Sequence, residues 1–400
     1  MSHYDPSYFA TEVVQNLSFP RLAGTEGEQK AQRFLEHELD KLGIEHVRKE
    51  SFTYSTVFMN VVLRVYDLVT GALMIAIFFL MFIPFYLLVL ALSFILLIYT
   101  LFSRQIRDRL HFAVNALGKK HSSLNYIAEL PPEGTPKGQT AEQNLILLVH
   151  YDSISHKLNP IFSGALYFFG LLGGTIYSFH AIGAVLLAAS GVIEGINPWS
   201  FVYGVGLAVL LNIQLANRRG NASHGTLDNA TGVANGLYLL DYFQHHPLQR
   251  TNLIVVFTGA EEVGDQGAHA FIERHYHELN LKSSFFLIVD SVGGNEQENL
   301  YFYGQGIPIR SFSPTIKAAI DRLLEQDKDR IYKLKSVYIP PLISYSTDHT
   351  PLKPNGYEFM IFGSNGSIHS DKDNVDHYYP ELVENFYEFT RDLLLYMDRH

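Results

Sequence analysis

Two long stretches with almost no charge limit what this chain can fold into. No residue between Asp67 and Arg104 is charged, and a second apolar stretch over residues 159–217 is interrupted by a single charged residue, Glu194. Because one straight membrane-spanning helix needs roughly 20 apolar residues, the first stretch is long enough for a pair of helices that turns at Pro84. Helices buried in a soluble core fit such long uncharged runs poorly, so the sequence predicts transmembrane helices.

The segments on either side of each stretch limit the number of membrane crossings. These segments carry the strands of one predicted folded domain, so the chain must return to the side from which it left. The simplest solution is one hairpin per stretch, and the second hairpin would pair helices over about 162–193 and 199–216. The sequence therefore predicts four transmembrane helices. His180, inside the longer helix, is predicted to hydrogen-bond to a neighbouring helix.

Cysteine content and net charge exclude several kinds of site and partner. The chain has no cysteine, which excludes disulfides, thiolate nucleophiles and cysteine-based zinc sites. Any metal site must therefore use His, Asp and Glu. The net charge of -10, without a basic stripe, argues against a nucleic-acid partner.

Polar residues follow three apolar strands that are predicted outside the membrane stretches. The strands and the residues that follow them are 144–149 with His150, 252–257 with Glu261 and Glu262, and 285–289 with Asp290. Apolar strands that alternate with helices predict an α/β fold with a mostly parallel central sheet flanked by helices. In such sheets ligands bind at the carboxyl ends of the strands. We therefore expect these polar residues to meet at one edge of the sheet.

Glu261 and Glu262 are adjacent carboxylates at the end of a buried strand. Two negative charges are unfavourable there unless a cation holds them. A divalent metal would use one glutamate as a ligand and leave its neighbour to transfer protons. Taken alone, the pair is also typical of a solvated helix start, where acidic residues are favourable.

Five further residues supply the donors that such a metal site needs. His150 and Asp152 are two positions apart at a strand end, so they point the same way and Asp152 can accept the second N–H of the His150 ring. Asp228 alone is typical of a helix N-cap, and Asp290 and His369 are unremarkable one by one. Together the set offers enough nitrogen and oxygen donors for two zinc-like ions that share one carboxylate.

The sequence at these positions resembles the M28 family of zinc aminopeptidases. The resemblance covers about residues 8–54 and 124–397 and leaves out both apolar stretches. The matching segments are Val149-His150-Tyr151-Asp152-Ser153, Asp228-Asn229-Ala230-Thr231-Gly232, Phe257-Thr258-Gly259-Ala260-Glu261-Glu262, Val289-Asp290, Ser346-Thr347-Asp348-His349 and Ile368-His369-Ser370.

The resemblance implies a bound pair of zinc ions. Asp228 would bridge the two ions. His150 and Asp290 would complete one site, and Glu262 and His369 would complete the other. Manganese or cobalt would suit the same donors, since His, Asp and Glu bind all three metals.

The resemblance also implies roles in catalysis for four other residues. Glu261 would be the general base, Asp152 would orient a metal-bound histidine, and Asp348 and His349 would shape the substrate pocket. The expected reaction is removal of N-terminal residues from peptides by a metal-activated water. The alternatives are a glutaminyl cyclase- or carboxypeptidase-like enzyme on the same scaffold, and an inactive receptor or scaffold module. The complete ligand set disfavours the glutaminyl cyclase, because similar cyclases use one zinc. It also disfavours the inactive module, because inactive relatives usually lose ligands.

The two hairpins divide the predicted catalytic domain into three parts. We expect residues 1–60, 104–158 and 218–400 in the catalytic domain, with hairpins at 61–103 and 159–217. The Lys and Arg residues near the hairpins lie on the catalytic side and are Arg48, Lys49, Arg64, Arg104, Arg107, Arg109, Lys119, Lys120, Arg218 and Arg219. Neither hairpin tip carries Lys or Arg, so the positive-inside rule predicts a cytoplasmic catalytic domain. The N-terminus does not resemble a cleavable signal, which agrees with this prediction. The expected partners are a peptide substrate and the lipid bilayer, and the hairpins offer a surface for homo-oligomer formation.

Overall fold

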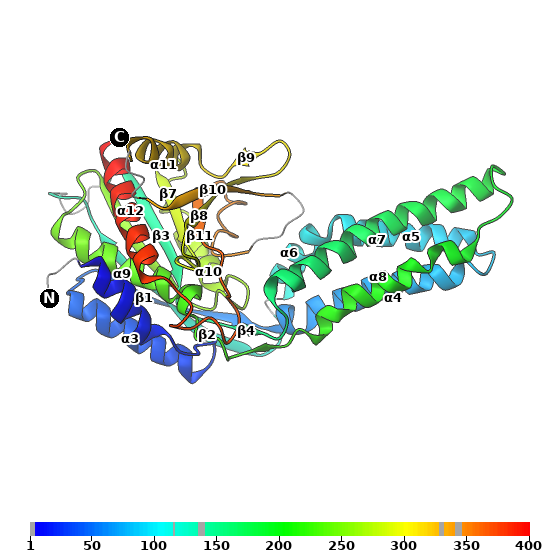
Figure 1. Cartoon of the computed structure of the whole chain (residues 1–400), viewed down its shortest axis with the longest axis horizontal. Helices are drawn as coiled ribbons and strands as arrows, with labels where there is room; N and C mark the ends of the chain where they lie inside the picture. Colours follow the sequence, from blue (N-terminus) through cyan, green and yellow to red (C-terminus); the bar gives the residue numbers. More distant parts are fainter. Residues whose placement is uncertain (1–4, 115–116, 135–140, 328–331, 341–345) are drawn as a thin grey trace.

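The protein has two parts of different shape, an α/β domain and a long helical bundle that extends from one side of it (Figure 1). This computed structural model describes residues 5–114, 117–134, 141–327, 332–340 and 346–400, without the side chains at positions 108 and 112. The chain leaves the α/β domain twice to build the bundle and returns each time.

The α/β domain is built on a nine-stranded sheet. Its strands are β1 (Val47–Ser55), β2 (Lys120–Leu130), β3 (Gln143–His150), β6 (Thr251–Thr258), β7 (Ser284–Val289), β8 (Asn299–Gln305), β9 (Arg310–Ser311), β10 (Leu334–Ile339) and β11 (Glu358–Gly363). They are ordered β1-β2-β6-β3-β7-β11-β8-β10, and β9 pairs with β8. A separate two-stranded sheet joins β4 (Ser155–His156) to β5 (Arg219–Gly220).

The sheet is mixed, whereas the sequence predicted a mostly parallel one. Its centre, β6-β3-β7-β11, is parallel. However, β2 runs antiparallel to both β1 and β6, and β8 runs antiparallel to β11. The first helical hairpin acts as a long loop that returns the chain beside β1, so β2 runs back along its neighbour. An apolar run indicates that a strand is buried but does not indicate its direction.

Alternate residues of the central strands face two separate hydrophobic cores. In β3, Leu145, Leu147 and Val149 pack into the larger core, and Ile146 and Leu148 pack into the smaller core on the other face. The smaller core is covered by α10 (Gln266–His275). The larger core is covered by the helical segments Phe9–Val13, α2 (Val14–Leu17), α3 (Glu26–Leu42), α9 (Thr231–His245), α11 (Pro314–Gln326) and α12 (Pro380–Arg399). The helix α3 ends at Leu42 and is capped by Gly43, which has a left-handed φ of 69°.

Both apolar stretches form helical hairpins. The first contains α4 (Leu63–Leu80), preceded by the helical turn Phe58–Val62, and α5 (Tyr86–Leu101). The second contains α7 (Pro160–Ala189) and α8 (Tyr203–Asn212). After α5 the chain bends by 80° into α6 (Ser103–Val114), which leads back to the α/β domain.

Three helical segments in the described part of the chain are long and apolar enough to cross a membrane. They are Phe58–Leu80, Pro160–Ala189 and Pro198–Ala216, and the count rises to four if the bent pair of α5 and α6 is one span. The predicted fourth helix, α5, has 16 residues, which is short for one straight span. Large apolar side chains such as Phe79, Leu87 and Phe169 are exposed on the bundle, as expected for a surface in contact with lipid.

Small and polar residues bring the helices of the bundle together. A Cβ atom on Gly204 of α8 would lie 2.5 Å from the ring of Tyr177 in α7, so only glycine allows this approach. His180 Nδ1 lies 3.1 Å from the hydroxyl of Tyr203, and the His180 ring stacks on Phe201. The predicted hydrogen bond from His180 to a neighbouring helix is therefore confirmed.

Candidate metal centre

The carboxyl ends of three central strands meet at one edge of the sheet. His150, the last residue of β3, is in register with Thr258, the last residue of β6. On the other side of β3, β7 ends one residue before Asp290. The loop after β6 carries Glu261 and Glu262 to the same edge, within ligand distance of His150. The structure thus brings together the strand-end residues that the sequence singled out.

The segment Thr226–Ala230, whose backbone departs from helical geometry at Asp228 and Asn229, carries Asp228 to this edge just before α9. The Asn229 side chain ties the turn to the sheet. Its amide donates a hydrogen bond to the carbonyl of Val289 at 2.7 Å, and its oxygen accepts one from the N–H of Gly232 at 3.0 Å. These bonds fix the backbone directly beside Asp228.

The Asp228 carboxylate lies between two histidines that are far apart in the sequence. Its Oδ1 is 3.1 Å from His150 Nε2, and its Oδ2 is 2.9 Å from His369 Nε2. The residue is buried, with 4% of its surface exposed. A carboxylate whose two oxygens face different nitrogen donors has the arrangement that a bridging ligand needs.

Two groups of potential metal ligands share Asp228. The first is His150, Asp228 and Asp290, and the second is Asp228, Glu262 and His369; within each group the ligand atoms lie within 4.8 Å of one another. His150 Nε2 is 3.7 Å from Asp290 Oδ1, and His369 Nε2 is 3.1 Å from Glu262 Oε2. These are the two ligand sets that the family resemblance implied.

The chemistry of this cluster fits divalent cations. His150 Nε2 and Glu262 Oε1 are buried and make no hydrogen bond to any residue in the described part of the chain. Burial, together with the nearby charge of Asp228, raises the pKa of Glu262 to about 7 although His369 opposes the shift. Buried acids with unsatisfied atoms are unfavourable unless they are paired or bind metal. Nitrogen and oxygen donors without sulfur suit zinc, manganese or cobalt.

Asp152 supports this edge through the loop that carries the two glutamates. Its carboxylate accepts hydrogen bonds from the backbone N–H groups of Glu261 at 3.0 Å and Glu262 at 3.2 Å. The nearest Asp152 carboxylate oxygen is 3.7 Å from His150 Nδ1, whereas the Asp152 backbone carbonyl is 3.2 Å from the same atom. The backbone of Asp152 is therefore the closer partner of the His150 ring, and the side chain fixes the two glutamates.

Glu261 is buried beside other acidic residues. With His150 and Glu262 it forms a third group of closely spaced potential ligands. Burial and the charges of Asp265, Glu262 and Asp290 raise the pKa of Glu261 well above its ordinary value, and the charge of His150 opposes this shift. A carboxyl group with a raised pKa is suited to accept and return a proton near neutral pH.

Asp348 and His349 lie next to the metal centre but are both buried. Asp348 is 1% exposed and accepts a hydrogen bond from the Thr258 hydroxyl at 2.5 Å, so it supports the end of β6. The His349 ring packs against Phe312 and Phe359, with ring centroids 6.3 Å and 5.3 Å away. A role for either residue in a substrate pocket stays a prediction.

Two buried charged residues that sequence reasoning missed hold the loops around the centre. The fully buried Arg21 guanidinium donates hydrogen bonds to the backbone carbonyls of Leu17, Phe19, Tyr151, His224 and Gly225. Asp373 accepts a hydrogen bond from the N–H of Leu227 at 2.7 Å, directly before Asp228. Burial raises the pKa of Asp373 to about 7, with the charge of Asp228 adding to the shift. Single charged residues in loops carry no local pattern that could have singled them out.

Residues 207–394 match the model of the family described as Peptidase family M28. The matched range contains Asp228, Glu262, Asp290 and His369 and begins after His150. The chain is also similar to a vacuolar membrane protease of Schizosaccharomyces japonicus (strain yFS275 / FY16936), at 28% identity over 155 residues. That alignment covers 38% of this chain and 17% of the relative, so the chain matches only a small part of the relative's length.

Several solved structures are similar to the chain in fold, among them a glutaminyl cyclase and a zinc aminopeptidase. Glutaminyl cyclase from Macrostomum lignano has a TM-score of 0.55 at 14% identity, covering 98% of this chain and 90% of that one. BSAP, a zinc aminopeptidase from Bacillus subtilis, has a TM-score of 0.54 at 13% identity, covering 97% of this chain and 94% of that one. At such low identity these similarities concern the fold alone.

Proposed function

The chain contains a peptidase family M28 domain at residues 207–394, and from this premise we propose that it is a membrane-embedded dimetal aminopeptidase. The proposed substrate is a peptide with a free N-terminus, and the proposed ions are zinc. Fold similarity to a zinc aminopeptidase and sequence similarity to a membrane protease support this choice.

One observation carries the proposal. The Asp228 carboxylate presents one oxygen to His150 and the other to His369 inside a buried cluster of acids. In the proposed centre, Asp228 is the shared ligand, His150 and Asp290 hold one ion, and Glu262 and His369 hold the other. Two such ions, when bound, lower the pKa of a water and polarise the scissile carbonyl.

The remaining steps belong to residues of the chain itself. Glu261 takes a proton from the attacking water and then delivers it to the leaving amine. The raised pKa of Glu261 supports this role, because the carboxyl group must hold the proton between the two steps. Asp152 binds the backbone N–H groups of Glu261 and Glu262, so one side chain positions both the base and a ligand.

The bundle is proposed to span the bilayer as two hairpins at about 61–103 and 159–217. Three segments have the length and apolarity of spans, and the bent pair of α5 and α6 is proposed as the fourth. Because the cations near the bundle lie at its catalytic end and the tips carry none, we place the catalytic domain in the cytoplasm. Protease accessibility in intact and opened vesicles tests this orientation, and cleavage of the catalytic domain from outside intact cells would contradict it.

Glutaminyl cyclase activity is the second candidate, because solved glutaminyl cyclases share the fold. A cyclase and an aminopeptidase act on the same end of a peptide, so one assay separates them. An aminopeptidase removes an N-terminal glutamine from a peptide by hydrolysis, whereas a glutaminyl cyclase cyclises that residue, releases ammonia and leaves the residue on the peptide.

The test uses the full chain purified in detergent with a panel of aminoacyl reporters and the N-terminal glutamine peptide. We expect release of N-terminal residues that a chelator abolishes and that added zinc restores. Ammonia release with cyclisation, without hydrolysis of any reporter, would favour the cyclase. Hydrolysis that the chelator does not affect would contradict a metal-dependent peptidase.

A further inference from the structure

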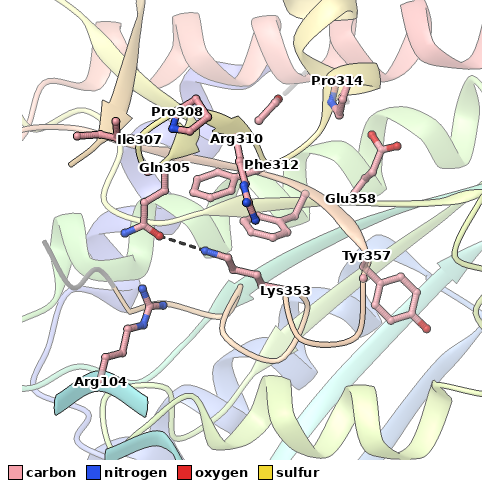
Figure 2. Close-up of a pocket in the computed structure, with 14 residues that line it drawn as sticks. Arg104, Gln305, Ile307, Pro308, Arg310, Phe312, Pro314, Lys353, Tyr357 and Glu358 are labelled. Carbon is pink, nitrogen blue, oxygen red and sulfur yellow. Dashed lines mark hydrogen bonds between the residues drawn. The ribbon is translucent and has the colours of Figure 1, made fainter. Parts of the chain in front are cut away.

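A cavity of about 610 Å³ is lined by none of the predicted metal ligands (Figure 2). Its size is within the range of roughly 300–1,000 Å³ that is usual for ligand sites. The residues of its wall that matter for its chemistry are Arg104, Gln305, Arg310, Phe312, Lys353 and Phe359.

Three of these residues are cations. Figure 2 shows the Arg104, Arg310 and Lys353 side chains around the same space, with Lys353 hydrogen-bonded to Gln305 at 3.1 Å. Burial and the charges of Arg104 and Arg310 lower the pKa of Lys353, as expected for like charges held close together. Within the described residues, no carboxylate lies within 4.0 Å of Arg310 or Lys353.

The one acidic residue of the cavity wall is engaged elsewhere. Glu358 accepts hydrogen bonds from the Ser313 hydroxyl and from the N–H of Thr315, at the start of α11. Its carboxylate therefore stabilises a helix N-terminus and, within the described residues, forms no ion pair with Arg310 or Lys353. In a chain with a net charge of -10, such a concentration of positive charge indicates an anionic ligand.

The cavity lies at the foot of the helical bundle. Arg104 is in the first turn of α6, directly after the apolar helix α5. The loop between β8 and β9 points in the same direction as the bundle (Figure 1). This loop exposes Ile307 by 86% and Ile309 by 48%, next to Arg310. Exposed apolar side chains flanked by cations are typical of protein surfaces that meet a bilayer interface.

We propose that this cavity binds a phosphate-bearing anion and that the headgroup of an anionic phospholipid supplies it. This lipid site rests on the membrane placement proposed above, and peptide hydrolysis does not require it. The cytoplasmic leaflet is rich in anionic lipids, and each Lys or Arg near its surface contributes about 1 kcal/mol, or roughly fivefold in affinity. The apolar loop would enter the interface while the cations hold the phosphate.

Native mass spectrometry of the full chain, released from a zwitterionic detergent, tests the proposal. The probes are dioctanoyl phosphatidylglycerol, dioctanoyl phosphatidylcholine and inorganic phosphate. The test variant is Arg310→Gln with Lys353→Gln, and a charge-preserving variant is Arg310→Lys with Lys353→Arg. A matched control changes two exposed cations elsewhere on the domain, Lys282→Gln with Arg322→Gln.

We expect the wild type to bind phosphatidylglycerol more tightly than phosphatidylcholine. The double Gln variant should bind phosphatidylglycerol about 30-fold more weakly, from two cations at about fivefold each. The charge-preserving variant and the control should stay within about threefold of the wild type. Equal binding of the two lipids, or undiminished binding by the double Gln variant, would overturn the proposal. Inorganic phosphate that binds as tightly as phosphatidylglycerol would overturn the lipid as the source of the anion. Neither metal binding nor hydrolysis is read out, so a negative result is separate from a failure of the proposed peptidase activity.

Discussion

Replacing Arg21 with lysine tests whether one buried side chain holds the loops that carry the metal ligands. The guanidinium is fully buried and donates hydrogen bonds to five backbone carbonyls. A lysine ammonium has three donors, so at least two of the carbonyls would lose their partner. Each buried group without a partner costs about 1–3 kcal/mol, which gives a loss of roughly 2–6 kcal/mol in the free energy of unfolding.

The assay is thermal unfolding of the full chain in detergent, with metal content measured in parallel. A loss of this size should lower Tm by about 2–7 °C in a chain of 400 residues. Because Arg21 contacts the carbonyls of Tyr151 and Gly225, next to two of the ligand segments, metal retention should also fall. The matched control is Arg33→Lys, the same change at an exposed position of α3, where an effect within about 0.5 kcal/mol is expected. If Arg21→Lys changed Tm no more than Arg33→Lys does, the hydrogen bonds would not carry the stability assigned to them.

Three further changes test the proposed base, a buried acid and the bundle. Glu261→Gln should lower turnover by about 10²–10⁴-fold with metal content unchanged, and near-normal turnover would remove Glu261 from the role of base. Burial raises the pKa of Glu28 to about 7 from an ordinary 4.5, so the folded state keeps a proton that the unfolded state releases between these values. The stability of the wild type relative to Glu28→Gln should therefore fall as pH rises from about 4.5 to about 7, and a difference in Tm that does not change with pH would refute this. Gly204→Ala should destabilise the bundle by about 1–3 kcal/mol, because the added methyl group would collide with Tyr177. The control Gly206→Ala should have no such effect, because the space beside Gly206 is open. Equal effects of the two changes on Tm would contradict the packing described.

Burial of the central strands could be predicted from the sequence, but the direction of the strands could not. Residues 145–149 of β3, 253–257 of β6 and 285–289 of β7 are all apolar, which is typical of strands covered on both faces. The edge strand β10 is exposed or half-buried except at Ile339, and its mixed composition gave no prediction. The antiparallel pairing of β2 depends on where the first helical hairpin returns the chain, and this is a property of the whole fold.

The proximity of His150, Glu262 and Asp290 could be predicted because each residue follows a recognisable strand, whereas the proposed ligand sets rest on the family resemblance. The acceptor of the His150 ring could not, because the Asp152 carboxylate and carbonyl are equally consistent with a His-x-Asp pattern. Only the position of the loop after β6 decides that the carboxylate turns to the N–H groups of Glu261 and Glu262. Buried single charges such as Arg21 depend in the same way on contacts between segments far apart in the sequence.

The number of zinc ions bound per chain tests the central claim most directly. Inductively coupled plasma mass spectrometry of the wild type and Asp228→Asn, after removal of free metal, measures this number. A carboxylate shared by both sites predicts about two ions in the wild type and a loss at both sites in the variant. A wild type that binds no more than one ion, or an Asp228→Asn variant that still binds two, would contradict a centre organised around Asp228.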